Sequence, residues 1–168
     1  MSTQSKHTYR TFVVDDEPMV CRILTKRLSQ DERLQVEAFP RGEAALEAFD
    51  PAPDFVILDY YMGENNMNGK EVLMKIKEQA PQTKVLMLSS QEKIGVAVET
   101  LKKGATDYVI KNQFFPVQVE QSLQKILDYN ELQLELSELK SQHKQERTRV
   151  WAVIGVVAVL AVAIFSMF

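Results

Sequence analysis

Short apolar runs alternate along this chain with longer amphipathic segments, and this alternation limits the folds open to it. The runs cover residues 11–14, 34–39, 55–58, 85–88 and 108–110. Four of them are almost wholly apolar, which is typical of strands buried on both faces of a parallel sheet, whereas the run at 34–39 is more polar and suits an edge. Helical patterns over about 18–30, 41–49, 69–79 and 91–103 lie between the runs. The sequence therefore predicts an α/β fold, a doubly wound five-stranded parallel sheet.

A last helix is predicted to begin at Pro116 and to continue without a break, because no glycine or proline occurs between positions 117 and 154. Within residues 130–149, Leu132, Leu136 and Leu139 have the spacing of a coiled-coil seam, and His143 and Glu146 take the next two seam positions. This makes about two heptads, fewer than a coiled coil usually needs. A solvated single-helix stalk and a weak dimeric coiled coil, hence a homodimer through the stalk, both stay open.

The final segment, residues 151–168, contains no charged residue. As a helix it would span about 27 Å, close to the hydrocarbon core of a bilayer, which is about 30 Å thick. Basic residues come just before it, at Lys140, Lys144, Arg147 and Arg149. We expect a single transmembrane helix over 150–168, with the preceding domain on the cytoplasmic side of the membrane. The alternative is an apolar helix buried in a soluble dimer.

Composition excludes several other classes of protein. Lys and Arg number 20 and Asp and Glu 23, so the chain lacks the basic excess of a nucleic-acid binder, and we expect no nucleic-acid partner. The single cysteine, Cys21, excludes an internal disulfide and a cysteine-rich zinc site. No apolar signal-peptide core occurs in residues 1–10, which favours a cytosolic location for the soluble part.

Polar residues follow the predicted strands at the points where the strands end. Asp15, Asp16 and Glu17 follow the first, Asp59 the third, Ser89 the fourth and Lys111 the fifth. The carboxyl ends of parallel strands share one edge of the sheet, so these side chains should meet there. Two carboxylates about 5 Å apart repel by roughly 3 kcal/mol, which a divalent cation would remove, and all-oxygen ligands suit Mg²⁺. A metal, a lysine and a hydroxyl around one carboxylate are the parts needed to move a phosphoryl group onto that carboxylate.

Four segments carry a family resemblance: FVVDDEP, VILDYYM, NGKEVL and GATDYVIK. Together with the strand-end residues, they resemble the receiver domain of two-component response regulators over residues 9–129. The resemblance implies a flavodoxin-like fold with strand order 2-1-3-4-5.

The resemblance also implies a role for each matching residue. Asp59 would be the phosphoacceptor, and Lys111 would pair with the phosphate. Mg²⁺ would be held by Asp16, Asp59 and the backbone carbonyl of Tyr61, and by Asp15 through water.

Further residues would sense or tune the phosphate. Ser89 would bond a phosphoryl oxygen, and Tyr108 would swing between exposed and buried positions, although a plain packing role for Tyr108 stays open. Tyr61 and Gln91 would flank the phosphate and tune its hydrolysis.

Three positions depart from the family pattern. Asn112 stands where a proline usually follows the lysine, and Gly63 stands where a proline is common. About two extra residues precede Asn68 in the same loop. Ser89 replaces the commoner threonine and keeps the hydroxyl.

The function expected from these features is that of a membrane-tethered single-domain response regulator with no output domain. It would receive phosphate from a sensor histidine kinase or a histidine phosphotransfer protein and signal to a protein partner. It would not be an enzyme beyond slow Mg²⁺-dependent self-dephosphorylation. The expected parts are a flexible N-terminus (1–8), the receiver (9–129), the stalk (130–149) and the transmembrane helix (150–168). The alternative is a phosphate-independent membrane scaffold that keeps the receiver fold.

Overall fold

The computed structural model describes the backbone of residues 8–63, 66–90 and 94–165. The chain divides into two compact units, Met1–Leu123 and Gln124–Phe168, which we describe separately.

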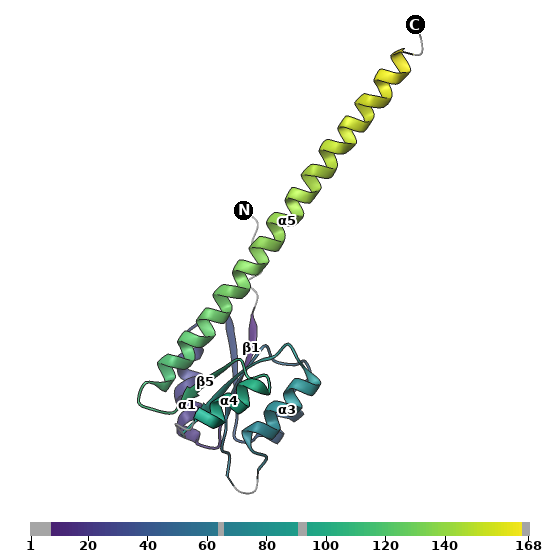
Figure 1. The fold of residues 1–168 in the computed structure, drawn as a ribbon. Coiled ribbons are helices and arrows are strands. Elements are labelled where there is room, and N and C mark those ends of the chain that lie inside the picture. Colours follow the sequence, from purple (N-terminus) through teal and green to yellow (C-terminus); the bar gives the residue numbers. More distant parts are fainter. Residues whose placement is uncertain (1–7, 64–65, 91–93, 166–168) are drawn as a thin grey trace. The chain divides into compact units, whose positions relative to one another are not determined.

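The first unit is built on a five-stranded parallel sheet (Figure 1). Its strands run in the order β2-β1-β3-β4-β5, which confirms the predicted order and places the more polar strand at an edge. The strands are β1 (Tyr9–Val14), β2 (Leu34–Phe39), β3 (Phe55–Asp59), β4 (Lys84–Ser89) and β5 (Asp107–Ile110).

The helices begin and end close to the predicted positions. Pro18 opens α1 at a position where its missing N–H costs no hydrogen bond. Asn68 caps α3, since its side chain accepts from the Glu71 N–H while the Glu71 carboxylate accepts from the Asn68 N–H. The helices are α1 (Pro18–Leu28), α2 (Gly42–Glu47), α3 (Gly69–Gln79), α4 (Ile94–Lys102) and α5 (Phe115–Phe165).

The hydrophobic core lies on both faces of the sheet. On one face, Phe12, Val56 and Val85 of the strands pack with helical residues from α2 and α3, among them Ala45 and Val72. On strands, alternate side chains point to opposite faces, so the neighbours of these strand residues are buried on the other side. Figure 1 shows α1 and α3 on opposite sides of the sheet. The covered sheet leaves its carboxyl edge as the place where polar side chains can gather.

The second unit consists of the greater part of α5. Its backbone is helical without interruption to Phe165, in keeping with the absence of glycine and proline between 117 and 154. In the part of the chain that the structure describes, we find no helix that is long and apolar enough to cross a membrane. The expected transmembrane helix over 150–168 therefore gains no support here, and the side chains of residues 152–168 lie outside the described part.

Candidate functional site

Three of the strand-end residues meet in a buried ion cluster. The Lys111 Nζ atom lies 3.0 Å from Asp59 Oδ2 and 2.8 Å from Asp15 Oδ2. The side chains are nearly inaccessible, with exposed fractions of 7% for Lys111, 4% for Asp59 and 0% for Asp15. The sheet brings them together because Asp15 follows β1, Asp59 ends β3 and Lys111 follows β5. The convergence predicted from the sequence is present.

Local hydrogen bonds fix the position of Asp15 between β1 and α1. Its N–H donates to the Phe39 carbonyl at 3.1 Å, and its Oδ1 accepts from the Glu17 N–H at 3.0 Å. The Cys21 thiol donates to the Asp15 carbonyl at 3.3 Å, so the backbone and the side chain of Asp15 are both held by hydrogen bonds.

A glycine makes room for the backbone at Asp59. The Gly69 N–H donates to the Tyr60 carbonyl at 2.9 Å, which brings the start of α3 against the end of β3. A Cβ atom at Gly69 would collide with the Asp59 carbonyl oxygen and lie 2.8 Å from the Tyr60 Cα. The position therefore needs glycine.

The cluster shifts the ionisation of its members. Burial, together with the charge of Asp15, raises the pKa of Asp59 to about 6, although Lys111 works in the opposite direction. Burial likewise raises the pKa of Asp15. Burial tends to lower the pKa of Lys111, but hydrogen bonds to Asp15 and Asp59 and their charges outweigh it and raise that pKa overall. The lysine stays charged, whereas burial makes the ionised forms of the two carboxylates less favourable than they would be in water.

The acids fit a divalent cation. Carboxylate oxygens of Asp15, Asp16 and Asp59 lie within 4.8 Å of one another. Asp15 Oδ2 is buried, and apart from the Lys111 ammonium 2.8 Å away no donor among the described residues is found for it. Such an oxygen can accept a metal ion, and a set of hard oxygen ligands suits Mg²⁺. When bound, the ion would neutralise the carboxylates and polarise a phosphoryl oxygen.

The structure gives positions, but no tested roles, for the other predicted residues that it describes. Ser89 ends β4 and is buried, and its carbonyl accepts from the Lys111 N–H at 2.8 Å. Tyr108 lies on β5 and is half-buried against the core. Tyr61 is 62% exposed and donates its backbone N–H to Asp59, whereas Gln91 lies outside the described residues. The roles of these four in sensing or tuning the phosphate stay predictions.

Asn112, which stands where the family usually has a proline, forms a turn that its own backbone and side chain stabilise. Its N–H donates to the Ile110 carbonyl, and its side-chain oxygen accepts from the Phe114 N–H, each at 2.8 Å. Lys111 reaches both carboxylates with this turn in place.

Gly63, the second departure, has a φ of 76°, a conformation that proline cannot adopt. The loop that contains it is held by Glu43 of α2, whose carboxylate accepts from the Met67 N–H at 2.7 Å. That hydrogen bond lowers the pKa of Glu43.

Sequence reasoning placed Glu17 at the carboxyl edge of the sheet without a specific role, and gave no role to Gly69 or Glu43. Glu17 Oε1 lies 3.2 Å from Lys111 Nζ at the exposed side of the cluster. Its position directly after Asp15 and Asp16 was the available signal. Glu43 gives no local signal, because its contact with Met67 depends on how the loop before α3 folds back onto α2.

The fold and the site together define a flavodoxin-like protein with an acidic pocket at the carboxyl edge of its sheet. The chain belongs to the response regulator receiver domain family, whose model matches residues 11–127. Receiver domains of two-component systems are phosphoacceptor signalling domains that bind Mg²⁺ at such an acidic pocket and interact with histidine kinases or phosphotransfer proteins.

Individual relatives cover the same part of the chain. The chemotaxis protein CheY of Listeria monocytogenes is 33% identical over 116 residues, which make up 68% of this chain and 92% of that protein. The alginate biosynthesis transcriptional regulatory protein AlgB of Pseudomonas aeruginosa is 30% identical over 87% of this chain, but the match covers only 32% of AlgB. The solved BeF3-activated DrrB receiver domain of Thermotoga maritima is 27% identical with a TM-score of 0.65, over 72% of this chain and 98% of that one.

Proposed function

We propose that this protein accepts a phosphoryl group from a phosphohistidine onto Asp59 and passes the signal to a protein partner from a position at a membrane. The observation that carries the proposal is the buried Lys111, held at 3.0 Å from the Asp59 carboxylate beside two further acids. A surface aspartate without a catalytic role would have no reason to sit in such a costly cluster.

The residues divide the chemistry among them. An oxygen of ionised Asp59 attacks the phosphorus atom, a phosphorus–oxygen bond forms, and the phosphorus–nitrogen bond of the donor breaks. The electron pair returns to the donor imidazole, which takes up a proton. Lys111 supplies positive charge beside the transferred group, and Asp15, Asp16 and Asp59, with the Tyr61 carbonyl, would hold Mg²⁺.

Phosphorylation would then change the ends of β4 and β5. Ser89 would bond a phosphoryl oxygen, Tyr108 would respond on the neighbouring strand, and Tyr61 and Gln91 would set the lifetime of the phosphate. New negative charge between Lys111 and Ser89 biases two arrangements of this edge, which a partner protein can distinguish.

The membrane part of the proposal rests on sequence. Residues 151–168 carry no charge, and basic residues precede them at Lys140, Lys144, Arg147 and Arg149. A tether at this end would leave the receiver on the cytoplasmic side, within reach of a membrane-bound sensor histidine kinase. A phosphate-independent scaffold with the same fold is the less favoured alternative, because it would not need the acid–lysine cluster.

Phosphorylation by a small phosphodonor tests the proposal directly. With Mg²⁺ present, the full-length protein should form an acid-stable, base-labile acyl phosphate detectable by intact mass. Asp59→Asn should abolish it, and Asp16→Ala should reduce it because a ligand is lost. Asp128→Asn, at an exposed position on α5, is the matched control and should label like the wild type. Full labelling of folded Asp59→Asn, or no labelling of the wild type, would contradict the assignment.

A further inference from the structure

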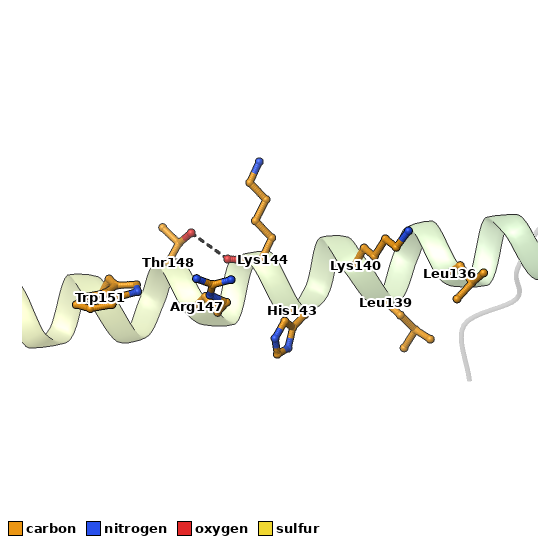
Figure 2. Close-up of a pocket in the computed structure, with 8 residues that line it drawn as sticks. All are labelled: Leu136, Leu139, Lys140, His143, Lys144, Arg147, Thr148 and Trp151. Atoms are coloured by element: carbon orange, nitrogen blue, oxygen red, sulfur yellow. Dashed lines mark hydrogen bonds between the residues drawn. The ribbon is translucent and has the colours of Figure 1, made fainter.

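One face of the second unit exposes apolar side chains in a strongly charged helix. Leu132, Leu136 and Leu139 of α5 have exposed fractions of 54%, 40% and 62%. Figure 2 shows Leu139 and His143 on the same side of the helix, with Lys144 and Thr148 pointing to the opposite side. We call Leu132, Leu136, Leu139 and His143 the stalk stripe.

The stalk stripe has the geometry of one half of an interface. Its residues are spaced by four, three and four positions, the alternating a and d spacing of a two-stranded coiled coil. Figure 2 shows that no other described element of the chain is drawn against Leu136, Leu139 and His143.

We propose that the stalk stripe packs against the stalk stripe of a second copy of this chain, as a short, parallel, in-register coiled coil. This proposal goes beyond phosphate transfer and does not depend on it.

Charge complementarity favours a second copy in this orientation. Glu135 and Lys140 are exposed and flank the stripe on opposite sides, five positions apart. In a parallel coiled coil, residues with this spacing and placement meet across the interface, so Glu135 of one copy would lie beside Lys140 of the other. The twofold symmetry forms this pair twice.

His143 supplies a reason for a fixed register. It takes a seam position that follows three leucines and precedes Glu146 at the next one, and a polar residue at such a position specifies the register of a coiled coil at some cost in stability. An offset pairing would place each His143 against a leucine, where its ring nitrogens would lose water without gaining a partner.

Cysteine crosslinking of the full-length protein in intact cells tests the geometry. In a Cys21→Ser background, Leu132→Cys and Leu139→Cys should each give disulfide-linked homodimers on mild oxidation, at least tenfold more than Ser141→Cys, which lies on the opposite side of the helix. In an antiparallel pair, residue 132 of one chain cannot lie beside residue 132 of the other while residue 139 also lies beside its counterpart, because the two positions are about 10 Å apart along the helix. Equal crosslinking at all three positions, or at position 139 but not 132, would overturn the proposal.

A charge reversal tests the flanking pair. In the Leu139→Cys background, Glu135→Lys or Lys140→Glu alone should lower dimer formation about tenfold, because two attractions become two repulsions. The two changes together should restore the wild-type level. Failure of the double change to restore crosslinking would overturn the parallel register, since a general loss of helix stability would not be corrected by a second reversal.

Discussion

Asp59 is the residue whose environment is most at odds with its charge. Burial and the neighbouring Asp15 raise its pKa to about 6, although Lys111 offsets part of the effect. Its value in an unfolded chain is near 3.8. Between these two values the folded protein binds the proton that the unfolded chain releases, so stability from this group is present below pH 3.8 and is lost as pH rises through about 6.

We therefore predict that Asp59→Asn stabilises the metal-free protein above pH 6. The expected gain is about 1–2 kcal/mol in the free energy of unfolding, after allowance for solvent screening, and it should shrink as pH falls toward 3.8. Urea unfolding with a chelator present, followed across this range, measures it. Asp16→Asn, which alters an exposed acid of the same cluster, should give a smaller gain. A gain for Asp59→Asn that does not depend on pH would show that the burial of charge is not its cause.

Lys111 is the only cation that contacts Asp15 and Asp59 among the described ion pairs, so its removal should expose their repulsion. We predict that Lys111→Gln lowers the free energy of unfolding by about 2–4 kcal/mol at neutral pH without metal. Mg²⁺ should recover part of the loss, because it can replace the missing positive charge. Thermal unfolding with Mg²⁺ or chelator checks this, and Lys125→Gln at an exposed position serves as the control. An equal loss with and without Mg²⁺ would count against a cation site at these acids.

At the scale of elements, the approach of α3 to β3 depends on one residue without a side chain. A Cβ atom at Gly69 would meet the Asp59 carbonyl oxygen, so Gly69→Ala has to push α3 away from the strand that carries Asp59. We predict a loss of about 2–3 kcal/mol in the free energy of unfolding and slower labelling by a small phosphodonor.

Gly95→Ala is the matched control, because it also lies in a helix and its Cβ would meet nothing within 4 Å. It should be neutral or stabilising by up to about 1 kcal/mol, as expected when alanine replaces glycine in a helix. Similar losses for the two variants would mean that the close approach at Gly69 is not what the fold requires.

The elements were predictable from sequence to the extent that their patterns are local. Buried parallel strands give apolar runs, and the more polar run at 34–39 predicted the edge position of β2, whereas the strand order followed from the family resemblance. The meeting of Asp15, Asp59 and Lys111 followed too, because parallel strands present their carboxyl ends at one edge. The contact of Glu43 with Met67 was out of reach, since it depends on the path of the loop before α3, which no periodicity encodes.

At the scale of the whole molecule, the two units carry separable properties. The acid cluster lies within the first unit, and the uncharged segment 151–168 within the second. We predict that the full-length protein sediments with membranes and is released by detergent but not by high salt, since salt screens only electrostatic adsorption. Deletion of residues 151–168 should leave it in the supernatant.

The deletion also separates location from chemistry. The shortened protein should take phosphate from a small donor at the full-length rate, yet be a poorer substrate for a membrane-bound kinase, because confinement to one surface raises effective concentration. Full-length protein that stays in the supernatant without detergent would refute the membrane part of the proposal. It would favour the alternative of an apolar helix buried against another chain.

The hydrogen bond from the Lys111 N–H to the Ser89 carbonyl links the two residues that flank Asp59 on neighbouring strands. If the Ser89 hydroxyl moves toward a bound phosphate as proposed, this bond would carry the movement to the backbone of Lys111. Under the proposed switch, the ends of β4 and β5 would therefore change together. We expect nuclear spin probes at positions 89 and 111 to report one shared exchange rate between them.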